Sequence, residues 1–307
     1  LSGPAAFRQT LLTLIAQAAR RIVIVTLYLQ DDDGGREILA ALYAAKARRP
    51  ELDIAVFVDW HRAQRGLIGK HKSAGNAGMY REWAQRLGDG LPIYGVPVQN
   101  RELFGVLHLK GFVIDDAVLY SGASLNDVYL ARHDRYRLDR YHLLRHAGLA
   151  DAMAGFVANR LAGSGAVRQL NVAEVPSTRS LQPQIRRLRG QLQQARYEVI
   201  PALPNADQVA VTPLLGFGRS GNQLDAVLLP LLREARERVM GLDARRSIED
   251  PVEAKRTVPI LLATIIAFFF HKTLGLEPAT VALTGAAIML LVTSQPLQDT
   301  IGGIEWA

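Results

Sequence analysis

The stretch "VLHLKGFVIDDAVLYS", residues 106–121, contains two short apolar runs joined at Asp115-Asp116. Two apolar runs separated by two turn residues predict a β-hairpin, although Asp-Asp is a weaker turn signal than Asp-Gly. The first run carries His108 and Lys110, which share one face of a strand because they are two residues apart. Burying two ionisable groups side by side is unfavourable, so that face opens to solvent or both side chains contact one anion.

The segments around this hairpin alternate between helix and strand patterns. An amphipathic helix opens the chain, helices are expected over 35–49, 79–88 and 147–163, and strands over 21–30, 52–60, 91–98 and 135–144. Continuous apolar runs of strand length between helices indicate strands buried on both faces. The fold class is therefore α/β, with a sheet flanked by helices.

Composition narrows the classes of partner. The chain has 307 residues, of which 49% are hydrophobic and 21% charged, which excludes general disorder. A net charge of +7 favours an anionic partner, such as a phospholipid surface, a nucleotide or nucleic acid. The absence of cysteine excludes disulfides and thiolate chemistry. The N-terminus lacks the pattern of a signal peptide.

Three regions are expected along the chain: residues 1–165, a basic linker with helices over 166–240, and a C-terminal hydrophobic helical hairpin over 241–307. The hairpin rests on apolar runs at 258–270 and 280–292. Each run is shorter than a typical transmembrane helix, but flanking basic residues favour membrane insertion of 257–293. The alternative is a buried helical hairpin.

The predicted hairpin turn brings the segment "SGASLN", residues 121–126, beside His108. A histidine, a cation and small hydrogen-bonding residues suit a phosphoryl group. We expect His108 to act as nucleophile or acid, Lys110 to stabilise charge, and Ser124 and Asn126 to donate hydrogen bonds. Asp115 has the opposite strand parity and is expected to shape the turn. A lone histidine on a strand is otherwise a satisfied core residue.

Three further segments carry candidate binding residues. Arg62 and Arg65, after the strand that ends near residue 59, could hold a pyrophosphate; the alternative is solvated loop charge. "QDDDGG", residues 30–35, could contact a polar head group, although helix capping by Asp33 is favoured. The basic stretch 179–196 could lie on anionic lipid, or form an ordinary solvated helix face.

The motifs resemble a known superfamily. "HLKGFVID" matches the H-x-K-x4-D motif of the phospholipase D superfamily. More narrowly, "YLQDDDGG", "VDWHRAQRG", "VLHLKGFVIDDAVLYSGASLNDVYL" and "DRYRLDRYHLL" resemble the N-terminal half of Gram-negative phosphatidylserine synthases, over about residues 5–238.

This resemblance implies one catalytic half of a phospholipase D-like fold. The implied reaction moves a phosphatidyl group from CDP-diacylglycerol to L-serine through a phosphohistidine at His108, with Lys110, Asp115 and Asn126 as further catalytic residues. Ser124, Arg62 and Arg65 are the expected substrate-binding residues. No metal and no other cofactor is implied, and the expected location is cytoplasmic, peripheral to the inner membrane.

The sequence departs from the superfamily pattern in two places. Among seven histidines, His108 alone has a lysine two residues on, whereas superfamily sites use two such motifs. The missing motif belongs beyond residue 238, so a homodimer is one way to complete the site. The superfamily's Gly-Ser is also replaced by Gly122-Ala123-Ser124.

From about residue 239 the sequence resembles an arsenite/sodium–proton antiporter-type transporter. Two unrelated resemblances that meet within one predicted helix indicate a chimeric reading frame. Two other functions stay open: a phosphodiesterase or nuclease that uses water in place of serine, and a non-catalytic membrane-anchored fragment. Nucleic acid is not an expected partner, because no aromatic residues interleave with the basic stretch.

Overall fold

The computed structural model describes residues 1–65, 75–99, 106–198, 211–215, 223–241, 250–271, 273 and 275–293. Contacts divide the chain into two compact units, Leu1–Pro230 and Leu231–Ala307. The proposed region boundaries at residues 165 and 240 stay predictions.

The first unit is built on a mixed sheet of seven strands in the order β6-β5-β4-β1-β2-β3-β7 within the described residues. β1, β2 and β3 are parallel, and the other neighbours are antiparallel. The strands are β1 Arg21–Val25, β2 Asp53–Asp59, β3 Ile93–Val96, β4 Gly111–Ile114, β5 Ala117–Ser121, β6 Tyr141–Arg145 and β7 Arg168–Gln169. The α/β class predicted from the alternating pattern is confirmed.

The predicted hairpin turn at Asp115-Asp116 is present. Ile114 pairs with Ala117 and Phe112 with Leu119, so two residues connect the strands. Asp115 has a φ of 50°, in the left-handed region that tight two-residue turns use. Aspartate tolerates this conformation better than most residues because its side chain can bond nearby backbone groups.

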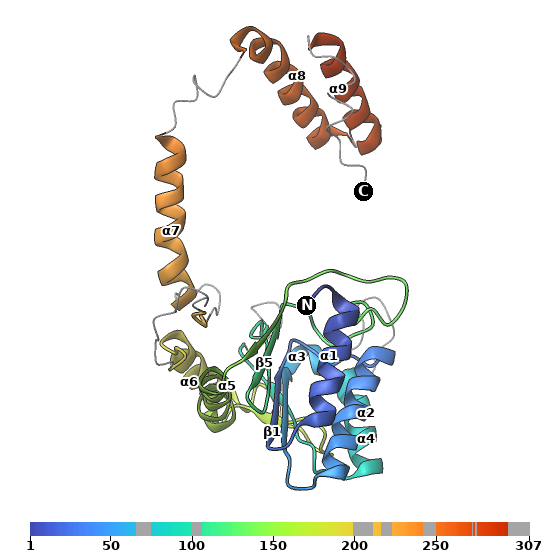
Figure 1. The fold of residues 1–307 in the computed structure, drawn as a ribbon, viewed down its shortest axis with the longest axis vertical. Helices are drawn as coiled ribbons and strands as arrows, with labels where there is room; N and C mark the ends of the chain where they lie inside the picture. Colours follow the sequence, from blue (N-terminus) through green and yellow to red (C-terminus); the bar gives the residue numbers. More distant parts are fainter. Residues whose placement is uncertain are drawn as a thin grey trace. The chain divides into compact units, whose positions relative to one another are not determined.

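Helices cover both faces of the sheet. Figure 1 shows α1, α2 and α4 on one side, and α5 and α6 on the other. Their bounds are α1 Pro4–Gln17, α2 Asp33–Arg48, α4 Asn76–Leu87, α5 Ala147–Phe156 and α6 Gln182–Gln193. The apolar stripe of α1 is buried, as its helical spacing predicts, through Phe7, Leu11, Leu14 and Ile15. The N-cap of α2 is Asp32 rather than Asp33, because the Asp32 carboxylate accepts the N–H of Gly35.

The short elements were not predicted from the sequence. Helix α3, Trp60–Gln64, directly follows β2, and β7 has two residues. The predicted helix over 147–163 is α5 followed by a π-helical turn η2, Val157–Leu161, and a 3-10 turn η3, Ala162–Ser164. The strand predicted over 135–144 begins only at Tyr141.

The basic helix α6 uses its apolar face for the protein's own core. Ile185, Leu188 and Leu192 are at most 3% exposed, whereas Arg186 and Arg187 face solvent. The apolar face is therefore not free to enter a lipid layer. Contact with an anionic surface would depend on the arginines alone.

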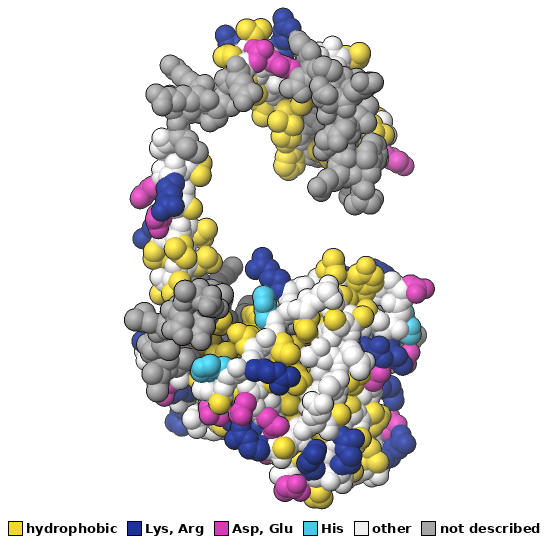
Figure 2. All heavy atoms as spheres, in the orientation of Figure 1, with side chains coloured by type: hydrophobic (Ala, Val, Ile, Leu, Met, Phe, Trp, Pro, Cys, Tyr) yellow, Lys and Arg dark blue, Asp and Glu magenta, His cyan; other side chains and the backbone are white. Residues whose placement is uncertain are grey.

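The helical hairpin expected in the C-terminal region is present as α8, Pro251–Phe270, and α9, Pro278–Val292. The helices approach closely at Gly285, where an added Cβ would lie 2.4 Å from Thr264 Oγ1. No helix in the described part of the chain combines the length and hydropathy needed to cross a membrane. Figure 2 shows hydrophobic side chains exposed along α8 and along α7, Gln223–Met240.

Candidate active site

His108 and Lys110 lie just before β4 rather than on it. β4 begins at Gly111, whose φ of +148° is a conformation that side-chain-bearing residues rarely adopt. The prediction that His108 and Lys110 lie on a strand was therefore wrong. Lys110 nevertheless stays close to the backbone of His108, since its Nζ atom lies 3.5 Å from the His108 carbonyl oxygen. The imidazole is exposed, while Lys110 is only 9% exposed.

The surroundings of His108 favour its neutral form. Burial lowers the pKa of His108, the positive charges of Lys110 and Arg62 lower it further, and Asp59 opposes the shift. Burial also lowers the pKa of Lys110, and the charge of Asp139 opposes that shift. A neutral imidazole has a free nitrogen lone pair, which a nucleophile requires.

Asp59, at the end of β2, ties the histidine loop to helix α3. One carboxylate oxygen accepts the N–H groups of His61 at 2.9 Å and Arg62 at 2.8 Å. The other oxygen accepts the N–H of Leu107, the residue before His108, at 2.7 Å. The side chain is 0% exposed, and burial raises its pKa. Sequence reasoning missed this contact, although an aspartate between a strand and a short helix is a recognisable N-cap signal.

Helix α3 brings one predicted arginine to the site. The positive charge of Arg62 lowers the pKa of His108 and opposes the burial that raises the pKa of Tyr28. The neighbouring His61 places its Nε2 atom 2.9 Å from the backbone oxygen of Gln99. Arg65 forms the C-cap of α3, where its N–H donates to the His61 carbonyl.

Ser124 and Asn126 are held against the chain that continues from β1. Leu125 forms a parallel bridge with Leu29, which fixes the residues on either side. Ser124 is 3% exposed and bonds the hydroxyl of Tyr28, a group whose pKa burial raises. The Asn126 amide donates to Gln30 Oε1 at 3.3 Å, and its oxygen accepts the N–H of Tyr129 at 3.1 Å. Tyr28 is a neighbour of the site that sequence reasoning missed.

Gly122 makes room for the acid that faces Lys110. Its N–H donates to Asp139 Oδ1 at 2.9 Å, and an added Cβ would lie only 2.8 Å from Asp139 Oδ2. The same carboxylate oxygen accepts the N–H of Arg140. Glycine at this position is therefore needed for close approach of the carboxylate. Asp139 was not singled out from the sequence.

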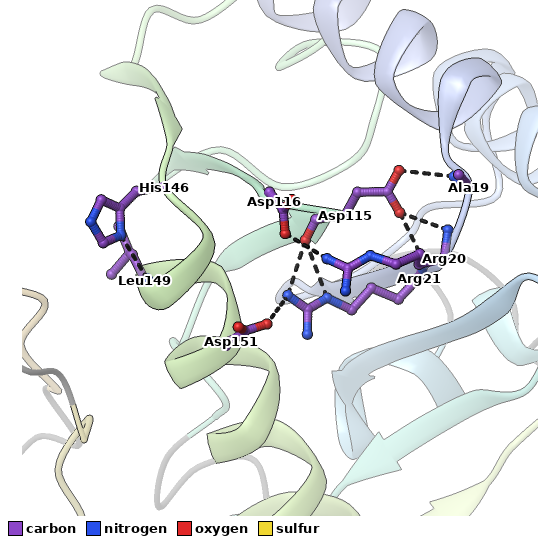
Figure 3. A network of polar contacts seen from close by, with 8 residues as sticks. All are labelled: Ala19, Arg20, Arg21, Asp115, Asp116, His146, Leu149 and Asp151. Atoms are coloured by element: carbon purple, nitrogen blue, oxygen red, sulfur yellow. Dashed lines mark hydrogen bonds and ion pairs between the residues drawn. The ribbon is translucent and has the colours of Figure 1, made fainter.

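Asp115 lies at the far end of β4 from His108. Its carboxylate accepts the backbone N–H groups of Ala19 and Arg20 at 2.8 Å and of Arg21 at 3.1 Å (Figure 3). These bonds lower the pKa of the carboxyl. The structure thus does not bring Asp115 to the imidazole. It connects the hairpin turn to the start of β1, in line with the expected turn-shaping role.

One group of three potential metal ligands occurs among the described residues. Asp33, Asp127 and His133 place single ligand atoms within 4.8 Å of one another. His133 Nε2 already pairs with both carboxylates, at 3.3 and 3.5 Å, and Asp127 also accepts the N–H of Gly34. These contacts connect the start of α2 to the segment that contains Asp127 and His133.

Comparison with known proteins agrees with this geometry. No protein-family model matches the chain. The CDP-diacylglycerol–serine O-phosphatidyltransferase PssA of Escherichia coli is 52% identical over 219 residues, which are 71% of this chain and 48% of that protein. The crystal structure of phosphatidylserine synthase from Haemophilus influenzae matches with a TM-score of 0.70 and 44% identity, covering 74% of this chain and 51% of that chain. This chain is a homologue of the phosphatidylserine synthases.

The resemblance to phosphatidylserine synthases inferred from the motifs is thereby confirmed. A second relative, the CDP-diacylglycerol–serine O-phosphatidyltransferase of Haemophilus influenzae, is 43% identical over 244 residues, which are 78% of this chain and 54% of that protein. The chain spans about half the length of the curated relatives it matches. These relatives give no support to a chimeric reading frame or to the transporter-like resemblance of residues 239–307.

Proposed function

We propose that this chain provides one catalytic half of a phosphatidyltransferase that moves a phosphatidyl group from CDP-diacylglycerol to L-serine. The observation that carries the proposal is an exposed imidazole whose pKa is lowered by burial and by the positive charges of the buried Lys110 and of Arg62. The activity for which the homologous synthases are named supports the choice of substrates.

In the first step, a ring nitrogen of His108 forms a bond to the phosphorus that carries the diacylglycerol. The bond from that phosphorus to the bridging oxygen breaks, and CMP leaves. Lys110 and Arg62 offset the negative charge that develops on the phosphoryl oxygens. The leaving oxygen belongs to a phosphate whose second pKa is about 6, so at neutral pH it needs little help from an acid.

The second step needs a general base in addition to His108. The serine hydroxyl must lose its proton to a base as its oxygen bonds the phosphorus and the bond to His108 breaks. His108 is the only histidine in the sequence with a lysine two residues on. We therefore expect a single chain to form the phosphohistidine faster than it resolves it.

Labelled CDP-diacylglycerol tests the proposal directly. The wild-type chain is expected to release one CMP per site and to retain an acid-labile label, and the His108→Ala chain to retain none. His133→Ala serves as the matched control, because that histidine is exposed and pairs with two surface carboxylates. Equal labelling of the wild type and His108→Ala would refute the nucleophile. Serine-independent continuous CMP release would indicate a hydrolase.

Pairing of two chains would supply the missing half of the site. Turnover per chain is then expected to rise with protein concentration, and mixing His108→Ala with wild type is expected to change the activity non-additively. Full turnover by a strict monomer would contradict this dependence.

Peripheral binding to the cytoplasmic face of the inner membrane follows from the substrate and from the exposed arginines of α6. Each arginine near an anionic surface contributes about 1 kcal/mol of attraction, which salt screens. Co-sedimentation with anionic vesicles should exceed that with neutral vesicles and fall when Arg186 and Arg187 are replaced by glutamine. Equal binding to both vesicle types would argue against an electrostatic contact.

A further inference from the structure

Helix α8 exposes large apolar side chains along one of its faces (Figure 2). No residue of α8 is buried. Apolar residues fill the a and d positions of a heptad pattern, and between 39% and 50% of each is exposed: Val258, Leu261, Ile265 and Phe268. We call these four residues the outer face of α8, together with the exposed residues that flank them, Leu262, Ile266 and Phe269. Apolar residues at this spacing are typical of a helix that pairs with another helix.

Helix α9 covers a different face of α8. Gly285 of α9 packs closely against Thr264, whose hydroxyl donates a hydrogen bond to the Ile260 carbonyl at 2.8 Å. Thr264 precedes Ile265 by one residue, which corresponds to about 100° around the helix. The contact with α9 therefore leaves the outer face exposed, and the polar group on the side toward α9 has its own acceptor.

The area of the outer face is close to what a stable interface needs. Its residues are about half exposed, so they present roughly 700 Å² per chain if a large apolar residue offers about 200 Å². Stable protein–protein interfaces bury about 800 Å² on each partner. Contiguous apolar patches of more than a few hundred Å² are rare on monomers and mark interaction sites.

The length of the apolar part of α8 favours another helix over a lipid bilayer as the occupant. Residues 258–270 are about 20 Å long at about 1.5 Å per residue, whereas the hydrocarbon core of a bilayer is about 30 Å thick. Extending the apolar part toward the start of α8 adds the charges of Arg256, Lys255 and Glu253. A helix of equal length matches the outer face from end to end.

The order of residues along the outer face is complementary to itself when the helix is reversed. If two copies of α8 pair antiparallel, Leu261 of one copy faces Ile265 of the other. Val258 of one copy then faces Phe268 of the other. A small residue meets a large one at each end, and two isomeric side chains meet in the middle, so the layers have similar volumes. Layers of even volume allow close packing without voids.

The charges at the two ends of α8 also favour the antiparallel pair. Lys255 and Arg256 precede the apolar part, so they would lie beside the C-terminal end of the other helix. That end carries the partial negative charge of its last carbonyl groups, which attracts cations. A parallel pair would instead place the basic residues of both copies side by side, where like charges repel.

We propose that two copies of this chain associate through the outer faces of α8, paired antiparallel about a two-fold axis. Such a contact is isologous, because each copy contributes the same residues. The inference goes beyond the proposed reaction, since it requires neither a substrate nor His108. It also supplies a condition for any pairing of two catalytic halves, because it raises the effective concentration of one chain near the other.

Sedimentation velocity of the full chain over a range of concentrations tests the association. We expect a reversible dimer, and Ile265→Glu should weaken it at least about a hundredfold by placing a charge in the interface. Ala263→Glu is the matched control and should leave the dimer unchanged, because Ala263 is exposed on the same helix outside the outer face. Thermal unfolding checks that each variant is folded. A monomeric wild type, or a dimer that Ile265→Glu leaves intact, would overturn the proposal.

Cysteine trapping tests the antiparallel register by a second route. The chain contains no cysteine, so each substitution introduces a single thiol. Under mild oxidation, a mixture of Leu261→Cys and Ile265→Cys chains should form disulfide-linked dimers at least about tenfold faster than Ala263→Cys chains, because a disulfide requires Cα atoms within about 7 Å. Equal rates would overturn the antiparallel pair, even if Ile265→Glu failed to fold.

Vesicle flotation and the His108→Ala chain separate this inference from its alternatives. A monomeric wild type that floats with phosphatidylcholine vesicles, and no longer does so as Ile265→Glu, would assign the outer face to lipid and overturn the dimer. The His108→Ala chain should dimerise like the wild type. A failure of the proposed phosphohistidine chemistry would therefore leave the dimer in place, and loss of the dimer alone would leave the chemistry of His108 untouched.

Discussion

Replacing Asp59 by asparagine tests whether the buried carboxylate positions His108. The substitution keeps the shape of the side chain but exchanges one acceptor oxygen for an amide NH2 donor. The amide oxygen can still accept from His61 and Arg62, while its NH2 then faces the N–H of Leu107. A buried donor left without an acceptor lowers the free energy of unfolding by about 1–3 kcal/mol.

The same substitution changes the titration of His108. Asp59 raises the pKa of that imidazole, so removal of its charge should lower the pKa further. The acidic limb of the pH profile for CMP release or phosphohistidine formation is then expected to move to lower pH. The rate on the plateau should fall as well, because the side chain at position 59 no longer accepts the N–H of Leu107 and no longer holds the histidine loop.

Two measurements test the predicted effects of Asp59→Asn on stability and on the pKa of His108. Chemical denaturation gives the change in the free energy of unfolding, and single-turnover labelling between pH 4 and about 8 gives the limb. Asp53→Asn is the matched control, since Asp53 begins the same strand and is exposed. An acidic limb that stays in place or moves to higher pH in Asp59→Asn would refute the electrostatic reasoning.

Three further substitutions follow from the described contacts. Gly122→Ala should displace the Asp139 carboxylate, because the added Cβ would lie 2.8 Å from its Oδ2 atom. Phosphohistidine formation, measured by labelling, should then be lower than in the wild type. Glu37→Gln should lower the free energy of unfolding by about 1 kcal/mol at pH 7. Because Arg8 lowers the pKa of Glu37, the wild-type advantage should vanish as pH falls below about 4 in acid titrations. Asp115→Ala should reduce the free energy of unfolding by about 1 kcal/mol in denaturation curves, since three backbone N–H groups lose their acceptor and water can reach the exposed ones.

Much of the fold was predictable because local patterns decide it. The two-residue turn at Asp115-Asp116 and the apolar periodicity of α1 depend on neighbours in sequence. The structure of residues 106–110 was not predictable in this way. The strand pattern continues through His108, but the backbone at Gly111 turns away at φ +148°. The alternation of apolar residues predicts a strand, but it does not predict where a glycine adopts a backbone conformation that ends the strand.

The site was predictable only in its central pair. His108 and Lys110 stand two residues apart, whereas Asp59 reaches Leu107 across 48 positions and Asp139 reaches Gly122 across 17. Such contacts depend on how the sheet and its loops pack. The residues near each partner in the sequence do not predict that packing. The predicted roles of Ser124, Asn126 and Arg65 stay predictions, since the described contacts hold them in place without testing their chemistry.

β6 stands at one end of the strand order in the described sheet. An outermost strand presents a row of amide and carbonyl groups that can pair with a strand of another molecule. We therefore expect slow self-association of the chain in dilute buffer through strands added at β6, next to the exposed Tyr120 of β5.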